Sequence, residues 1–239
     1  MQLFYAPNIT PPYHTLSEEE SKHCVRVLRL GLGDTIHITD GGGNLFCCSI
    51  IEASPKRCSV EVVSTQREYE KMPYSLTVAI APTKSNDRYH WFLEKATEVG
   101  ISDIIPIITH HSERRQVKLE RDEKIITSAV KQSLKAYHPQ LHETMSFKEL
   151  VSRGGDGRVR FIAHCGESLS KEGFIYLPHA IQAGDSVEVL IGPEGDFSPQ
   201  EVELAIENGY REITLGSQRL RTETAALMAV MMVNIVNNS

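Results

Sequence analysis

The sequence predicts an α/β protein in two parts, a small β-rich domain over residues 1–72 and a parallel α/β sheet over residues 73–239. Two observations predict this division. Short strands separated by glycine and proline turns fill the first part, whereas strands alternate with helices from Ser75 onward. The stretch from Gln66 to Pro73 is polar and ends in proline, which predicts a linker. We therefore place the domain boundary there.

In the first part, Ser17 to Glu20 has the pattern of a capping box, with Ser17 as N-cap and Glu20 at the third helical position. A helix should run from there towards Leu28. Three strands are expected next, because apolar and β-branched residues recur between turns at the triple glycine and at Ser54-Pro55; they are residues 34–40, 45–51 and 58–63.

In the second part, Asp87 can cap a helix that runs to Val99, with Gly100 just beyond its end. Ser198 is a strong helix start, since proline follows it and Glu201 stands at the third helical position. That helix should stop at Asn208-Gly209. The other expected elements are the strands 76–81, 104–108, 159–163, 187–191 and 213–215 and the helices 119–137 and 225–236.

The last helix, Ala225–Val236, is apolar on nearly every side. A surface helix would show a single apolar stripe, so this one must be covered on most of its faces. A monomer could enclose it in its own core, and a second subunit could cover it equally well. We expect a homodimer.

Composition excludes several classes. Of 239 residues 41% are hydrophobic and 23% charged, which is ordinary for a globular protein. No apolar run approaches the roughly 20 residues of a membrane helix, and the first residues lack the pattern of a signal peptide, so we expect a cytoplasmic protein. Its 5 cysteines show no spacing typical of zinc sites, and we expect no metal.

The net charge of −6 is unevenly spread, because residues 73–155 carry more basic than acidic side chains. Basic residues gather there between Arg114 and Lys135. A local basic face can bind RNA whatever the total charge. A solvated helix face explains the same composition, and the composition leaves both interpretations open.

Two loops hold most of the functional signal. The first, Gly192-Pro193-Glu194-Gly195, follows a strand, and its glycines allow the backbone to approach a ligand closely. Phosphate-loop and dinucleotide-binding glycine patterns are absent, which disfavours a nucleotide-dependent enzyme of Rossmann type. Nucleophile elbows and zinc-protease helices are absent too.

The second loop places Arg219, Arg221 and Glu223 just before the apolar helix. Thr222 as N-cap and Glu223 in the first turn have a purely structural explanation. Arg221 is harder to explain that way, because an arginine beside a glycine loop is often a contact to an anion or polar ligand.

These two motifs, IGPEGDF followed by LG and then RLRTETAALMA, resemble the C-terminal signature of the 16S rRNA uridine-N3 methyltransferases of the SPOUT class. The resemblance extends over essentially the whole chain, since HCVRVLRLGLGDTIHITDGGG looks like the PUA-like N-terminal segment of that family. KATEVGISDIIP and Lys131-Gln132-Ser133 match its central motifs.

The resemblance implies a C-terminal domain tied in a deep trefoil knot, a PUA-like β-barrel before it, and a homodimer. It also implies that the knot loops hold S-adenosyl-L-methionine. The cofactor-binding residues carried over by motif are Ile191, Gly192, Glu194 and Gly195 on one side, Leu215, Gly216, Leu220, Arg221 and Thr224 on the other, and His164, whose loop closes the site.

The implied reaction is methylation of N3 of a uridine in 16S rRNA, free or within the small ribosomal subunit. N3 must lose its proton before it can attack a methyl group, so a base and a cation are expected. We assign to Arg221 the stabilisation of the charge that develops on the uracil oxygens, and to Glu223 the removal of the N3 proton. The candidates for RNA binding are Arg26, Arg29, Arg114 and Arg115.

The chain departs from the family pattern in three places. Gln2 stands where arginine is common, Asp196 replaces the third glycine after GPEG, and Gln218-Arg219 replaces Arg-Ile. Two alternatives keep the same fold: a related knotted methyltransferase that acts on another RNA, and a non-catalytic RNA-binding protein. Intact glycine loops speak against the second.

Overall fold

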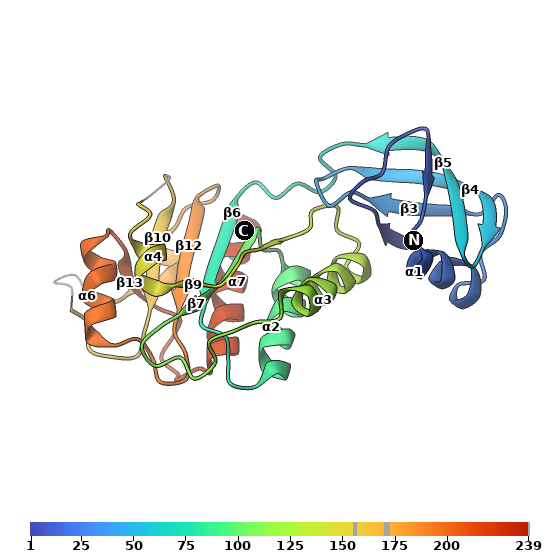
Figure 1. The fold of residues 1–239 in the computed structure, drawn as a ribbon. Helices are drawn as coiled ribbons and strands as arrows, with labels where there is room; N and C mark the ends of the chain where they lie inside the picture. Colours follow the sequence, from blue (N-terminus) through green and yellow to red (C-terminus); the bar gives the residue numbers. More distant parts are fainter. Residues whose placement is uncertain (155–156, 170–172, 239) are drawn as a thin grey trace. The chain divides into compact units, whose positions relative to one another are not determined.

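The computed structural model describes residues 1–154, 157–169 and 173–238. The chain forms two compact units (Figure 1). The first contains Met1–Lys71 together with Thr127–His138, and the second contains Met72–Ile126 and the chain from Pro139 onward. This division differs from the predicted order of two domains in one respect. A segment from the middle of the sequence, Thr127–His138, belongs to the first unit.

The first unit is built on a five-stranded sheet with the order β1-β3-β4-β5-β2. Its core is formed by the inward side chains of the strands, among them Phe4, Ile36, Ile38 and Val60, all fully buried. The strands are β1 (Leu3–Tyr5), β2 (Tyr13–Thr15), β3 (Thr35–Thr39), β4 (Leu45–Ser54) and β5 (Arg57–Gln66). The three longer ones match the predicted strands, whereas β1 and β2 are too short to show a periodic pattern.

The helix expected from Ser17 is divided in two. α1 (Glu18–Lys22) continues as a π-helix, η1 (His23–Val27). Only half of the expected capping box forms: Ser17 Oγ accepts a hydrogen bond from the Glu20 backbone N–H at 3.2 Å. The Glu20 carboxylate does not return to the N-cap, because it accepts a hydrogen bond from Lys131 Nζ at 2.6 Å.

Helix α3 (Leu119–Gln132) ends earlier than the predicted Tyr137. Leu134 has a φ of 59°, in the left-handed region that no helix can continue through. The residues that follow pack onto the first unit: the Ala136 carbonyl accepts a hydrogen bond from the Gly43 N–H at 3.0 Å. His138 stacks on Tyr5 with ring centroids 4.9 Å apart. These contacts explain why residues 127–138 belong to the first unit.

Within the residues that the structure describes, the second unit contains a parallel sheet of eight strands. Its main path has the order β11-β13-β10-β12-β6-β7-β8, and β9 also pairs with β7. Its strands are β6 (Ser75–Ile80), β7 (Asp103–Ile108), β8 (Gln140–Leu141), β9 (Met145–Ser146), β10 (Val159–Ala163), β11 (Ile175–Tyr176), β12 (Ser186–Ile191) and β13 (Arg211–Thr214). Every strand pair in it is parallel, as the alternation of strands and helices predicted.

Helices cover both faces of this sheet (Figure 1). On one face, α4 (Phe147–Val151) and α6 (Pro199–Glu207) pack on Ala79, Ile162 and Leu190. On the other, α7 (Thr222–Asn238) packs on β6 and β12 and on the helices α2 (Asn86–Val99) and α5 (Leu177–Ala180). Burial on both faces explains the continuous apolar runs of the central strands.

The helix ends match the sequence in part. α6 has the full capping box expected at Ser198, and it ends at Asn208 as predicted. The N-cap of α2 is Ser85, so Asp87 lies in the first turn and does not cap it. The short elements α4, α5, β8, β9 and β11 were not predicted. No helix in the described part of the chain is long and apolar enough to span a bilayer.

Candidate active site

The sheet of the second unit brings the two predicted loops together. In the register of the strands, Ala163 lies beside Ile191 and Ile213, so β10, β12 and β13 end at the same edge. The loops that follow these strands therefore meet there. A ligand crevice is expected at this position in an open parallel sheet.

A cavity of about 360 Å³ opens between these loops, within the size range of small-molecule sites. Its lining mixes apolar side chains, glycine backbone and charged groups. It is formed by Ala163, His164, Cys165, Ile191, Gly192, Pro193, Glu194, Asp196, Ile213, Thr214, Leu215, Gly216, Gln218, Arg219, Leu220, Arg221, Thr222 and Ala225.

Of the ten residues predicted to bind the cofactor, eight line this cavity: His164, Ile191, Gly192, Glu194, Leu215, Gly216, Leu220 and Arg221. Gly195 and Thr224 are not among the lining residues. At Gly195 a β-carbon would stand only 3.0 Å from His111 Cβ, so this glycine permits the close approach of another loop. Gly216 has a φ of 128°, which glycine adopts readily.

Sequence reasoning missed the last residues of the strands, Ala163, Ile213 and Thr214, and also Asp196 as part of the wall. The strand ends could have been found, since the loops must begin where the strands stop. In the sequence, Asp196 differs from its surroundings only as a departure from glycine. Its position in the wall depends on contacts between loops that are distant in sequence.

His164 is held by a buried carboxylate. Its Nε2 lies 2.8 Å from Glu212 Oε1, and the two side chains are 3% and 0% exposed. Glu212 also accepts hydrogen bonds from Ser168 Oγ and from the Leu169 N–H, both at 3.0 Å. The carboxylate on β13 therefore fixes the orientation of an imidazole that lines the cavity.

The second loop contributes two exposed arginines, Arg219 and Arg221, to the cavity wall. The Arg221 carbonyl accepts the hydrogen bond of the Ala225 N–H at 2.7 Å, which ties this residue to the first turn of α7. Burial raises the pKa of the Cys165 thiol, the negative charge of Asp196 adds to that shift, and Arg219 opposes it. Positive and negative groups thus face the same small volume.

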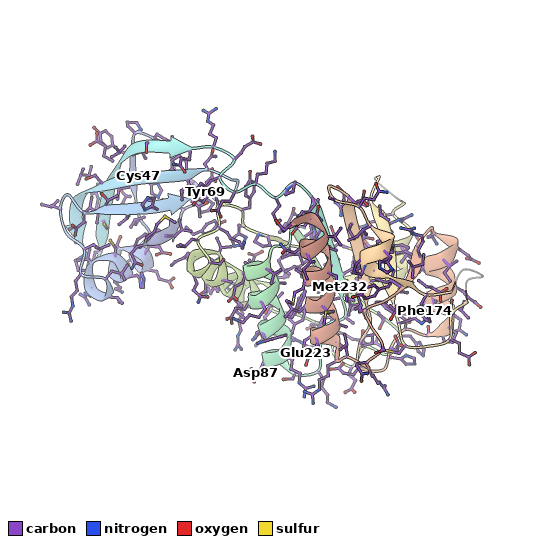
Figure 2. The ribbon with its side chains drawn as sticks, turned by 180° about the vertical axis from the view of Figure 1, so that it is seen from behind. Cys47, Tyr69, Asp87, Phe174, Glu223 and Met232 are labelled. Atoms are coloured by element: carbon purple, nitrogen blue, oxygen red, sulfur yellow. The ribbon has the colours of Figure 1, made fainter. Side chains whose placement is uncertain are left out.

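Glu223 is not among the cavity residues. It lies at the start of α7, near the first turn of α2 that carries Asp87 (Figure 2). Its carboxylate is buried, with Oε1 3.7 Å from Arg88 Nε. The other oxygen, Oε2, has no hydrogen-bond partner among the residues that the structure describes.

The four predicted RNA-binding arginines have different surroundings. Arg26 and Arg29, in the first unit, and Arg115 are exposed. Arg114 is half-buried: its guanidinium lies 5.7 Å from the centre of the Tyr89 ring, and its Nε donates to the Gln116 carbonyl at 2.9 Å. The geometry of Arg114 is that of a packed side chain, whereas the other three face solvent.

The cavity suits a ligand with a flat apolar part and charged groups at one end. Ile191, Leu215 and Leu220 offer apolar contacts, while Glu194, Asp196 and the two arginines supply charges of both signs. S-adenosylmethionine combines these features, since it carries an adenine ring, a sulfonium and an amino-acid group. The residues present therefore fit this cofactor.

Comparison with known proteins gives the same result for both units. Residues 70–234 match the family model of the RNA methyltransferase domain, and residues 16–63 match that of the RNA methyltransferase PUA domain. Ribosomal RNA small subunit methyltransferase E of Bacillus subtilis is 29% identical over 229 residues, which cover 92% of this chain and 88% of that protein.

Solved structures agree. A "probable rRNA-methyltransferase" from Porphyromonas gingivalis is 39% identical and superposes with a TM-score of 0.92, over 100% of this chain and 99% of that one. Ribosomal RNA small subunit methyltransferase E from Neisseria gonorrhoeae, solved with bound S-adenosyl methionine, is 26% identical with a TM-score of 0.84, over 96% and 95% of the two chains. This chain therefore belongs to the family of S-adenosylmethionine-dependent RNA methyltransferases with an N-terminal PUA domain.

Proposed function

We propose that this protein methylates N3 of a uridine in the 16S rRNA of the small ribosomal subunit. One observation carries the proposal: two loops that are typical of the uridine-N3 enzymes form the walls of a single cavity at the edge of the sheet. The names of its relatives, which describe methyltransferases of small-subunit ribosomal RNA, support the substrate class.

Arg221 is proposed to act on the substrate. When bound, S-adenosylmethionine supplies an electrophilic methyl group, whose transfer to N3 leaves the electrons of the C–S bond on sulfur. Loss of the N3 proton places negative charge on O2 and O4 of the uracil. The exposed guanidinium of Arg221 in the cavity wall can stabilise that charge.

Glu223 is proposed to accept the N3 proton. Glu223 lies outside the cavity lining, but no described residue hydrogen-bonds its Oε2, which leaves this oxygen as an unused acceptor beside the second loop. Arg88, 43% exposed, is its ion-pair partner. The competing role is structural, in which Glu223 joins α7 to α2 through Arg88.

The RNA is proposed to be held by phosphate contacts from exposed arginines of both units, Arg26 and Arg29 in the first and Arg115 in the second. Arg114 is a candidate of a different kind, since it packs on Tyr89. We further propose a homodimer, because α7 leaves Met231 and Ile235 exposed at 42% and 59%. Acting on ribosomal RNA would place the protein in the cytoplasm, and the trefoil knot stays a prediction.

One experiment tests the reaction. The protein is incubated with methyl-labelled S-adenosylmethionine and small ribosomal subunits that lack the modification, and the labelled nucleoside is mapped. Label on uridine N3 supports the proposal. Label on another nucleotide would indicate a related enzyme for a different RNA, and no label with intact RNA binding would indicate a non-catalytic RNA-binding protein.

Two variants separate the roles of the proposed residues. Arg221→Ala should lower kcat by at least about 100-fold, the usual effect of removing a group that stabilises developing charge. Glu223→Gln should lower kcat on the order of 100-fold, because the amide cannot accept the proton. If Glu223→Gln keeps the kcat of the parent, the residue only joins α7 to α2.

A further inference from the structure

One residue of the cavity wall has an unfavourable backbone conformation. Asp196 has a φ of 63°, in the left-handed region that glycine adopts freely and that aspartate adopts more often than most other residues, but still at a cost. For aspartate that cost is about 1 kcal/mol at most, because its side chain can hydrogen-bond locally. The same position carries glycine in the sequence pattern that this chain resembles. A side chain that accepts this cost at a binding site is expected to have a role.

The side chain of Asp196 joins two walls of the cavity. Its Oδ2 accepts a hydrogen bond from the Cys165 N–H at 2.7 Å, which belongs to the loop after β10. Its Oδ1 accepts one from the N–H of Phe197 at 2.8 Å, within the loop after β12. Both acceptors are carboxylate oxygens, which form stronger hydrogen bonds than neutral groups.

The backbone of Asp196 reaches a third loop. Its carbonyl oxygen lies 3.0 Å from His111 Nδ1, in the loop that follows β7. His111 also packs closely against Gly195, the residue before Asp196. A single residue therefore connects the loops that follow β7, β10 and β12.

The segment that carries His164 and Cys165 is thereby held at both ends. Asp196 binds it at the Cys165 N–H, and Glu212 binds it at His164 and at the Leu169 N–H. His164, Cys165 and Asp196 all line the cavity. Since a preformed site loses less conformational freedom when its ligand binds, these bonds should strengthen binding.

We propose that Asp196 is a positioning residue that presets the cavity for S-adenosylmethionine by joining the loop after β10 to the loop after β12. This inference rests on the proposed function of the cavity. It assigns to the aspartate a role that glycine cannot fill, because glycine has no group to accept the Cys165 N–H.

The test is equilibrium binding of S-adenosylmethionine to the full chain, measured by calorimetry without RNA. Asp196→Gly relieves the backbone strain but also removes the two hydrogen bonds of the carboxylate, so its melting temperature should fall only slightly. Its Kd for S-adenosylmethionine should nevertheless rise on the order of tenfold, the effect of losing a hydrogen bond to a charged group. In the methyltransferase assay, KM for S-adenosylmethionine should rise while kcat changes by less than about twofold.

Asp196→Asn and Glu70→Gly complete the design. The asparagine keeps one acceptor oxygen and should give an intermediate Kd. Glu70 is another acidic residue at positive φ, 50°, but it lies in the first unit outside the cavity lining, so Glu70→Gly should leave the Kd unchanged.

Two results would overturn the inference. A Kd for Asp196→Gly within about twofold of the parent would mean that the carboxylate does not position the cavity loops for S-adenosylmethionine. A large fall in melting temperature for Asp196→Gly, with a parent-like Kd for the fraction that stays folded, would mean that the residue only stabilises the fold. If the parent itself does not bind S-adenosylmethionine, the proposed function fails, which is a separate outcome.

Discussion

Asp122 is a carboxylate in a place that disfavours charge. The side chain is fully buried, and its Oδ2 has no hydrogen-bond partner within the described residues. Its Oδ1 lies 3.1 Å from His90 Nε2. Burial raises the pKa of Asp122, and the charges of His90 and Arg114 oppose that shift. The sequence places this residue in the first turn of a helix, where a carboxylate looks favourable.

The raised pKa leads to a prediction about stability. The folded protein binds the proton of Asp122 more tightly than the unfolded chain does. The contribution of this group to stability is therefore fully present at low pH and is lost as the pH rises through the folded pKa. Asp122→Asn should therefore raise the free energy of unfolding by about 1–2 kcal/mol at pH 8. The gain should shrink towards pH 4, as measured by urea denaturation.

Asp87→Asn is the control, since Asp87 is an exposed carboxyl in the first turn of α2. A gain for Asp122→Asn that is equal at pH 4 and pH 8 would mean that the carboxylate is not the source of the effect. A loss of stability at pH 8 would mean that its bond to His90 outweighs the cost of burial.

Among the elements, α3 departs most from its predicted role. The sequence leaves open whether its basic residues bind RNA or only face solvent, yet its C-terminal part belongs to the first unit. Lys131 on α3 reaches Glu20 on α1, and their side chains are only 25% and 14% exposed. The Lys131 ammonium also lies 5.9 Å from the centre of the Phe4 ring. The charge of Lys131, which composition alone would direct to RNA or solvent, therefore forms an ion pair within the first unit.

A double-mutant cycle of Glu20→Ala and Lys131→Ala should give a coupling free energy of about 1 kcal/mol, because the pair is partly shielded from water. The exposed pair Glu120 and Lys124 on the same helix, with side chains 90% and 73% exposed, is the matched control. Its coupling should stay below about 0.5 kcal/mol. Equal couplings would show that burial adds nothing to the Glu20–Lys131 pair. Unfolding by urea provides the free energies.

At the scale of the whole molecule, α7 remains the element with an uncovered face. Its inner side is buried on the sheet and on α2, with Ala226, Val230 and Val233 fully covered. Met231 and Ile235 remain exposed on it, and Trp91 on α2 is 42% exposed. Exposed apolar side chains on two neighbouring helices favour a contact with a second copy.

Sedimentation at micromolar concentration should give the mass of a dimer for the parent chain. Ile235→Lys should shift it towards the monomer, because a lysine ammonium would be buried in the apolar contact. Ile51→Lys, at an exposed apolar position of the first unit, should remain dimeric. A parent that sediments as a monomer would contradict the proposed homodimer.

Much of the architecture follows from local sequence. Five strands of the second unit, β6, β7, β10, β12 and β13, are predicted within one or two residues, because they carry apolar residues and helices separate them. The two-residue strands β8, β9 and β11 are too short to be predicted. Ser198 predicts its capping box because all its partners lie within four residues. The prediction of α2 is right at its end, Val99 with Gly100 beyond it, but wrong at its start, where the N-cap is Ser85 and not Asp87. The end of α3 is also less predictable, because Leu134 stops the helix by its backbone conformation.

The two glycine loops were determined by the sequence itself, since glycine after a strand has a local meaning that needs no partner. Only the tertiary structure decided what surrounds them. It joined Asp196 to Cys165 across 31 residues and His164 to Glu212 across 48. It also turned Glu223 towards Arg88, 135 positions away in the chain and outside the cavity lining. The physical reason is that hydrogen bonds and ion pairs between distant loops depend on the order of strands in the sheet, and no local pattern encodes that order.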